Sequence, residues 1–258
     1  MTHAVMCEDL WKTYQLHRPL GVKTLLLGAD TPRDTRFARE WALAEVGFQV
    51  PRGRSFGVIG PNGSGKTTLL SILLSTVQED RGRVSLSGRV APLLELGAGF
   101  HGDLTGRENV FLFGSILGVR LAEIRRRFDN IADFSELEGA IEQPLRTYSA
   151  GMIARLGFST IIHSPADILL IDEVLAVGDA SFQAKCHRAL REFRARGGTL
   201  IIVSHNMKEV TEVCDEGICL DLGRVVDAGP MAGVAARYQE RMAAADRAQV
   251  RGGALGKP

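Results

Sequence analysis

Short apolar runs alternate with stretches of helical periodicity along most of the chain. Residues 55–60 (SFGVIG), 168–172 (ILLID) and 199–204 (TLIIVS) are nearly continuous apolar segments of strand length. Such runs are typical of buried strands, and the segments between them carry apolar residues at helical spacing. We therefore predict an α/β architecture.

The same patterns predict most of the remaining elements. Helices are expected over residues 67–75, 180–196, 206–214 and 231–245, two strands around Gly88 within 83–96, and a hairpin over 217–229. From residue 107 to residue 163 the spacing is helical throughout, which indicates a helical insertion in an α/β core. We place a helical subdomain at 100–163 inside a domain of residues 1–245, followed by a disordered tail at 246–258.

Composition and charge exclude some classes of function. The 258 residues are 45% hydrophobic and 24% charged, so the chain can bury a substantial core. A net charge of +1 gives no electrostatic argument for binding nucleic acid, and no apolar run has the length of a membrane span. The four cysteines lack the C-x-x-C spacing of metal sites, so we expect packing residues in a reducing, cytosolic compartment.

The apolar run at 168–172 ends in two adjacent carboxylates, Asp172 and Glu173. Burying an unpaired carboxylate is costly, so these groups lie at an exposed strand end or meet a positive partner there. The pattern alone leaves both readings open.

A phosphate-binding loop upstream offers such a partner. GPNGSGKTT matches G-x-x-x-x-G-K-[ST], and it follows a predicted strand and opens a predicted helix, as this motif requires. Backbone N–H groups of the loop and helix terminus would hold phosphate oxygens, Lys66 would reach the β- and γ-phosphates, and the Thr67 hydroxyl would bind Mg²⁺. The predicted nucleotide-binding residues of the loop are Gly60, Pro61, Asn62, Gly63, Ser64, Gly65, Lys66, Thr67 and Thr68.

The loop gives the two carboxylates distinct predicted roles. In P-loop proteins an acidic residue at the end of a second apolar strand holds Mg²⁺, which suits Asp172. Glu173 would orient the water that attacks the γ-phosphorus. ATP and Mg²⁺ are therefore the expected cofactors.

The segment YSAGM, residues 148–152, resembles the signature motif of the ATP-binding subunits of ABC transporters, commonly L-S-G-G-Q. Ser149 and Gly151 match that motif, whereas Ala150 and Met152 depart from it. The resemblance implies an ABC-type P-loop NTPase domain with a RecA-like core, an antiparallel β subdomain and a helical subdomain. It also implies a homodimer in which Ser149 and Gly151 contact the nucleotide held by the other copy.

Further motifs of that family follow in the expected order. VGDA resembles the D-loop, with Asp179 at its aspartate, and IIVSHN resembles the switch strand, with His205 as the histidine that reaches the γ-phosphate. Tyr14 resembles the aromatic residue that stacks on adenine. The resemblance thus makes Glu173, His205 and Lys66 the expected catalytic residues.

One departure concerns the glutamine that the family places after the strand following the phosphate loop, where it touches Mg²⁺. Residues 91–109 contain no glutamine, and Glu95 is the nearest candidate metal ligand.

The stretches LLELGAGFHGDLTGREN and DEVLAVGDASFQAK look most like the branch that exports cell-surface polysaccharides. This implies a separate membrane permease, a lipid-linked glycan as cargo, and a peripheral position on the cytoplasmic face of the plasma (inner) membrane. Residues 16–39 are either the extra loop of that branch near the membrane or a plain surface insertion. We expect no C-terminal carbohydrate-binding domain after Arg241.

Three alternatives remain at this point. The chain could serve an importer or drug exporter, act as an ABC-type switch on ribosomes or DNA, or bind ATP without hydrolysing it. The single cassette and the absence of a basic stripe disfavour the switch, and the presence of both Glu173 and His205 disfavours the inert binder.

Overall fold

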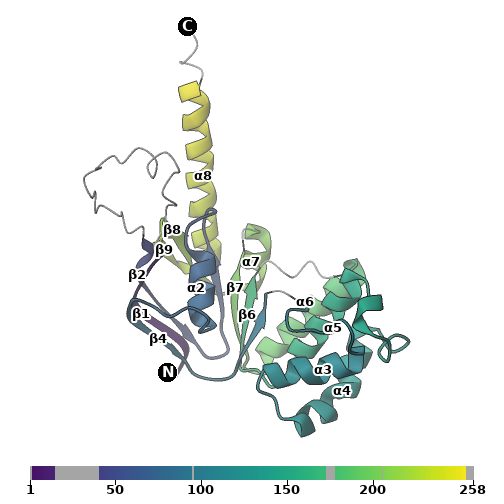
Figure 1. The fold of residues 1–258 in the computed structure, drawn as a ribbon. Coiled ribbons are helices and arrows are strands. Elements are labelled where there is room, and N and C mark those ends of the chain that lie inside the picture. Colours follow the sequence, from purple (N-terminus) through teal and green to yellow (C-terminus); the bar gives the residue numbers. More distant parts are fainter. Residues whose placement is uncertain (1, 15–40, 95, 173–177, 205, 254–258) are drawn as a thin grey trace, which may run out of the picture.

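The computed structural model describes residues 2–14, 41–94, 96–172, 178–204 and 206–253 of the chain. Its described part contains a six-stranded sheet, a three-stranded sheet and a group of helices set to one side (Figure 1). No helix among these described residues is long and apolar enough to cross a membrane.

The larger sheet forms the centre of the molecule and has the strand order β5-β6-β7-β3-β8-β9. The first five strands run parallel, and only β9 pairs antiparallel with its neighbour β8. In order across the sheet the strands are β5 (Val90–Leu93), β6 (Ile168–Asp172), β7 (Thr199–Val203), β3 (Ser55–Ile59), β8 (Glu216–Asp221) and β9 (Arg224–Pro230). Because β3 and β6 run in the same direction, the loops after both strands emerge at one edge, where ligands of such sheets bind.

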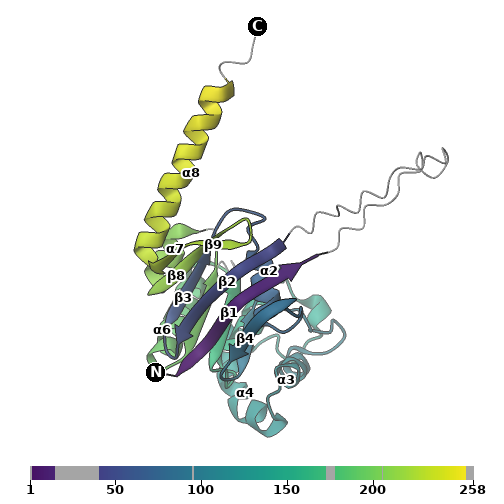
Figure 2. The ribbon, with the colours of Figure 1, turned by 90° about the vertical axis from the view of Figure 1, so that its left-hand side faces the viewer.

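The smaller sheet is antiparallel, with the order β2-β1-β4 (Figure 2). Its strands are β1 (His3–Thr13), β2 (Trp41–Pro51) and β4 (Arg81–Leu86). A shared apolar core joins it to the central sheet and to α2 (Lys66–Leu73), through buried residues such as Val5, Leu43 and Leu69. Burying one such side chain contributes about 1.5–3 kcal/mol, so this core fixes α2 and the loop before it.

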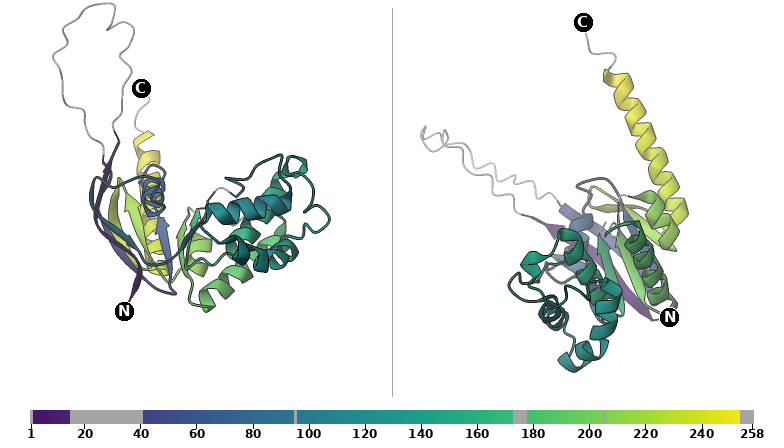
Figure 3. Two further views of the ribbon diagram at one scale, coloured as in Figure 1. Left: turned by 60° about the horizontal axis from the view of Figure 1, so that its bottom comes forward. Right: turned by 90° about the vertical axis from the view of Figure 1, so that its right-hand side faces the viewer.

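The helical group has a core of its own, built mainly from α3, α4 and α5. The helices are α3 (Gly106–Ile116), α4 (Leu121–Ser135), the 3₁₀ turn η1 (Leu145–Thr147), α5 (Ala150–Ile162) and α6 (Ala180–Ala195). A reciprocal capping box starts α3, in which Thr105 bonds the N–H of Glu108 and Glu108 bonds the N–H of Thr105. Figure 3 shows α3 and α4, in teal, standing beside the sheets, whereas α6 shares the core of the central sheet through buried residues such as Phe182 and Leu190.

Most predicted elements occur within a few residues of their expected ends. The two strands predicted around Gly88 both form, yet β4 enters the small sheet and β5 the large one. The hairpin turns at the predicted place, and α7 spans Met207–Val213. All four cysteines are buried and unpaired, and burial raises the thiol pKa of Cys7 and of Cys186 to about 12. They act as apolar packing residues, as expected.

The C-terminal helix differs from the prediction. α8 covers Met231–Gly253, so helical backbone occupies residues 246–253, which we expected to be disordered. Residues 246–251 include two Arg, one Ala and one Gln, which are good helix formers, and glycines 252 and 253 coincide with the end of the helix. Met231, Val234 and Ala235 anchor the first turns of α8 in the core, and the helix then projects beyond the sheet (Figures 1 and 3). Residues 254–258 lie outside the described part.

Candidate nucleotide site

The phosphate loop runs from the end of β3 to the start of α2, as predicted. Gly60 has a φ of 150° and Gly65 a φ of 102°, and a Cβ at Gly60 would strike the carbonyl oxygen of Leu220. Both positions therefore need glycine. No side chain caps the first turn of α2, whose N-cap is Gly65, so its N–H groups and positive helix end suit an anion.

Lys66 folds over the loop. Its ammonium group donates hydrogen bonds of 2.8 Å to the carbonyl oxygens of both Gly60 and Pro61. These bonds hold the positive charge at the mouth of the loop, where phosphate oxygens would compete with the carbonyls for it.

A hollow of about 410 Å³ opens beside the loop. Its lining combines residues from five separate parts of the chain: Tyr14, Ala42, Asn62, Gly63, Gly65, Lys66, Thr67, Thr68, Asp172 and Val203. Three of the predicted loop residues, Gly60, Pro61 and Ser64, do not line this hollow. The carbonyl oxygens of Gly60 and Pro61 accept hydrogen bonds from the Lys66 ammonium group, and Ser64 is buried. The exposed ring of Tyr14, 46% accessible, stands at the same hollow as the loop, as the adenine assignment requires.

Asp172 reaches this hollow because it is the last residue of β6. Strand β6 pairs in parallel with β7, where Asp172 lies opposite Val203, and both residues line the hollow with Thr67. A hydroxyl and a carboxylate are oxygen ligands that Mg²⁺ accepts, with phosphate oxygens and waters completing its shell. The described residues hold no cluster of three His, Cys, Asp or Glu side chains, so a metal here would depend on those additional ligands.

The predicted signature motif lies at the start of another helix. Ser149 is the N-cap of α5 and accepts a hydrogen bond of 3.2 Å from the N–H of Met152. Ser149, Gly151 and Met152 line a second hollow of about 500 Å³, together with Glu136, Leu137, Gly139, Ala140, Arg155 and Gly178. This hollow shares no residue with the one at the phosphate loop.

Asp179 is the N-cap of α6 and has two partners. One carboxylate oxygen accepts the N–H of Phe182 at 2.9 Å, and the other accepts from the Arg155 guanidinium at 2.8 Å. The N–H of Phe182 and the nearby charge of Arg155 hold the pKa of Asp179 below its usual value. Arg155 was not singled out from the sequence, because nothing in its own segment indicates that its partners lie on two other elements.

The two parts of the expected site therefore lie apart in one chain. Helix α2, with the phosphate loop, sits against the sheets, whereas the start of α5 belongs to the helical group (Figure 1). Three further candidates, Glu95, Glu173 and His205, lie outside the described residues.

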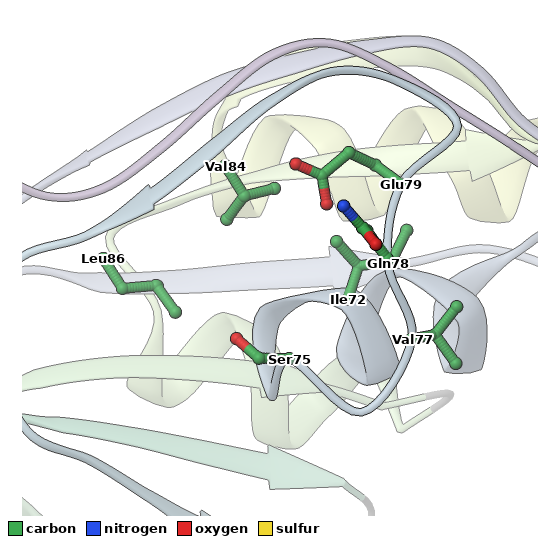
Figure 4. A pocket seen from close by; sticks show the side chains of 7 residues that line it. All are labelled: Ile72, Ser75, Val77, Gln78, Glu79, Val84 and Leu86. Atoms are coloured by element: carbon green, nitrogen blue, oxygen red, sulfur yellow. The ribbon is translucent and has the colours of Figure 1, made fainter.

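A third hollow has no connection to these motifs. It measures about 440 Å³ and lies between the end of α2, the loop after it and β4 (Figure 4). Its lining combines apolar and polar residues: Ile72, Ser75, Val77, Gln78, Glu79, Val84 and Leu86. No predicted nucleotide-binding residue reaches it.

Comparison with known proteins supports the family resemblance. A family model described as ABC transporter matches residues 43–176. The O-antigen export system ATP-binding protein RfbB of Klebsiella pneumoniae is 40% identical over 246 residues, spanning 94% of this chain and all of that protein. The teichoic acids export ATP-binding protein TagH of Lactococcus lactis subsp. lactis is 40% identical over 239 residues, which cover 92% of this chain and 50% of that protein.

Solved structures agree at the level of the fold. An ATP binding subunit of an ABC transporter superimposes with a TM-score of 0.74 at 21% identity, covering 92% of this chain and 94% of that one. The predicted fold class is thereby confirmed. From the family match and the whole-length similarity to RfbB, we conclude that the chain belongs to the ABC transporter family and is one of its ATP-binding proteins.

Proposed function

We propose that this chain hydrolyses ATP to drive export of a lipid-linked cell-surface polysaccharide through a separate membrane permease. The observation that carries the proposal is similarity at 40% identity, over nearly the whole chain, to a protein named for O-antigen export. Similarity to a protein named for teichoic acid export points to the same class of cargo. Such a subunit would work at the cytoplasmic face of the plasma membrane, bound to its permease.

Within one chain, the hollow at the phosphate loop would bind ATP and Mg²⁺. The N–H groups at the start of α2 would hold the phosphates, and Lys66 would exchange its bonds to loop carbonyls for bonds to phosphate oxygens. Thr67 and Asp172 would bind the metal, which neutralises charge on the β- and γ-phosphates. The Tyr14 ring would stack on the adenine.

Hydrolysis would need a second copy of the chain. Ser149 and Gly151 lie in a hollow separate from the phosphate loop, so a copy turned head to tail would bring its α5 terminus to the γ-phosphate. We assign Glu173 the role of orienting the attacking water and His205 that of contacting the γ-phosphate.

Co-purification tests the proposal. The tagged chain is expressed with the membrane protein encoded beside it, and ATPase activity is measured with and without candidate lipid-linked glycans. We expect a stable complex whose ATPase rate responds to a glycan. A complex that responds only to another class of substrate would indicate an importer or drug exporter. Activity that is independent of any membrane partner would indicate a nucleotide switch.

A further inference from the structure

Four charged side chains join the start of α6, the end of α4 and the signature helix α5. Arg155 on α5 donates to Glu136 at 2.9 Å and to Asp179 at 2.8 Å, and Lys185 on α6 donates to Glu136 at 3.0 Å. We call Arg155, Glu136, Asp179 and Lys185 the bridging cluster. Arg155 is the centre of the bridging cluster, because within the cluster only its guanidinium contacts the carboxylates of both Glu136 and Asp179.

Arg155 is held more firmly than an ordinary surface arginine. Only 19% of its side chain is exposed, and its guanidinium lies over the ring of Phe182, 4.7 Å from the ring centre. Phe182 is itself buried. A planar group that stacks on a fixed ring and bonds two carboxylates has little freedom to turn.

The cluster also shapes the backbone before α6. Gly178 has a φ of 70°, and a Cβ there would come within 3.2 Å of the Arg155 side chain. The next residue, Asp179, uses its second carboxylate oxygen to cap α6. Residues 178–179 are therefore packed and bonded against a side chain that comes from the signature helix.

Arg155 and Ser149 belong to the same helical segment, six residues apart, and both line the hollow of about 500 Å³ with Gly178. Any rotation of α5 would thus move Ser149, Arg155 and the segment carrying Asp179 together. Ser149 and Asp179, which one copy would present to the nucleotide of its partner, are therefore linked through Arg155.

We propose that Arg155 is a positioning residue for ATP hydrolysis at the site of the other copy, acting by holding Ser149 and Asp179 at a fixed spacing. This inference rests on the two-copy site of the proposed function. Arg155 does not line the hollow at the phosphate loop of its own chain, so the proposed effect concerns the nucleotide site of the other copy.

The first experiment compares Arg155→Met, which keeps an unbranched apolar stem but removes the guanidinium and its charge, with Arg155→Lys. We expect Arg155→Met to lower kcat about tenfold to hundredfold, the range seen when reacting groups are misplaced by small distances. ATP affinity of the isolated chain should stay unchanged. Arg155→Lys should recover part of kcat, because one ammonium group keeps the charge but cannot bond two carboxylates in the same geometry. Arg126→Met, at an exposed arginine of α4, is the matched control and should leave kcat unchanged.

The second experiment asks on which copy Arg155 acts. Arg155→Met chains, with an intact phosphate loop and Glu173, are mixed with Glu173→Gln chains, whose signature helix is intact. Each mixed dimer then contains one complete site. With random pairing, half of the dimers are mixed and half of their sites are complete, so activity should recover to about a quarter of wild type. Arg155→Met alone should show the tenfold to hundredfold lower activity given above, and Glu173→Gln alone should be nearly inactive.

A parallel mixture of Ser149→Ala with Glu173→Gln separates the two proposals. If that control mixture fails to recover activity, the two-copy site itself is wrong. If the control recovers and the Arg155 mixture does not, Arg155 acts within its own chain and the inference is overturned. Loss of ATP affinity in Arg155→Met would overturn it as well. Should Arg155→Met fail to fold, Arg155→Lys takes its place in the mixture, since it retains the charge beside Phe182.

Discussion

The two helix termini to which we assign phosphate contacts, the starts of α2 and α5, are built in different ways. At the start of α2 the N-cap is Gly65 and no side chain caps the first turn. At the start of α5 the Ser149 hydroxyl already bonds the N–H of Met152. The first terminus therefore offers its N–H groups to an anion directly, while the second satisfies one of them internally.

The residues around the two termini also differ. The loop before α2 adds the Lys66 ammonium group and, across the same hollow, the hydroxyl of Thr67 and the carboxylate of Asp172. Near the terminus of α5, the Arg155 guanidinium bonds Glu136 and Asp179 instead. ATP affinity should therefore reside in the first terminus, and the second should matter for hydrolysis once two copies meet.

The largest expected effect comes from a group that belongs to neither terminus. Glu173→Gln should slow hydrolysis by about 10²–10⁴-fold, the usual contribution of a positioned general base, because an amide does not draw a proton from the attacking water. ATP affinity should stay within about twofold, since the phosphate-holding groups are unchanged. Phosphate release and equilibrium ATP binding measure the two quantities. A hydrolysis rate within a few-fold of wild type would remove Glu173 from the mechanism.

Lys66→Ala tests the first terminus itself. Loss of one charged hydrogen bond to phosphate is worth about 1.5–3 kcal/mol, so ATP affinity should fall by about tenfold to hundredfold. Titration calorimetry on the isolated chain measures this. Lys208→Ala, at an exposed lysine of α7, is the matched control. Equal affinities for wild type and Lys66→Ala would contradict the nucleotide assignment of the loop.

The phosphate loop and Asp172 could be predicted from the amino-acid sequence. The phosphate loop could be found because its chemistry is local: glycines, a lysine and a threonine between one strand and one helix. Asp172 could be paired with it because P-loop proteins hold Mg²⁺ with an acidic residue at the end of a second apolar strand. The first inference needs only neighbours in the chain, and the second also needs what is general to P-loop proteins.

Other features depend on contacts that no local pattern carries. Arg155 meets Glu136, from the end of α4, and Asp179, before α6, so its role appears only after the helices have packed. Strands β4 and β5 are separated by three residues and still enter different sheets. The continuation of α8 to Gly253 was missed because its second half lacks the apolar face that marked the first.

Ser149→Ala tests the second terminus. Loss of an N-cap hydroxyl costs about 1 kcal/mol of stability, which lowers Tm by a few degrees. Affinity for ATP in the isolated chain should not change, whereas the rate of hydrolysis should fall. Calorimetry of binding and a thermal melt on the same sample separate these effects. If Ser149→Ala lowered ATP affinity as much as Lys66→Ala does, the proposal that ATP affinity depends on the α2 terminus and not on the α5 terminus would be wrong.

The smallest expected effect concerns acid stability at the start of α6, where Asp179 bonds Arg155 of the signature helix α5. The Phe182 N–H and the Arg155 guanidinium lower the pKa of Asp179 in the folded chain. The carboxylate therefore contributes stability above its unfolded pKa, and this contribution is lost as pH falls through its folded pKa. Asp179→Asn keeps a good N-cap, so it removes chiefly the charge that faces Arg155.

We expect Asp179→Asn to lower Tm slightly at neutral pH, and we expect this difference to close as pH falls through the lowered folded pKa, where the wild-type carboxyl becomes protonated as well. Thermal melts from neutral to acid pH measure the closure. In an Arg155→Met background, Asp179→Asn should lower Tm by a smaller amount at neutral pH, because the Asp179 carboxylate no longer faces the Arg155 guanidinium. If the difference in Tm were constant across pH, Asp179 would act only as the N-cap of α6, and its charge would contribute nothing to the contact with Arg155.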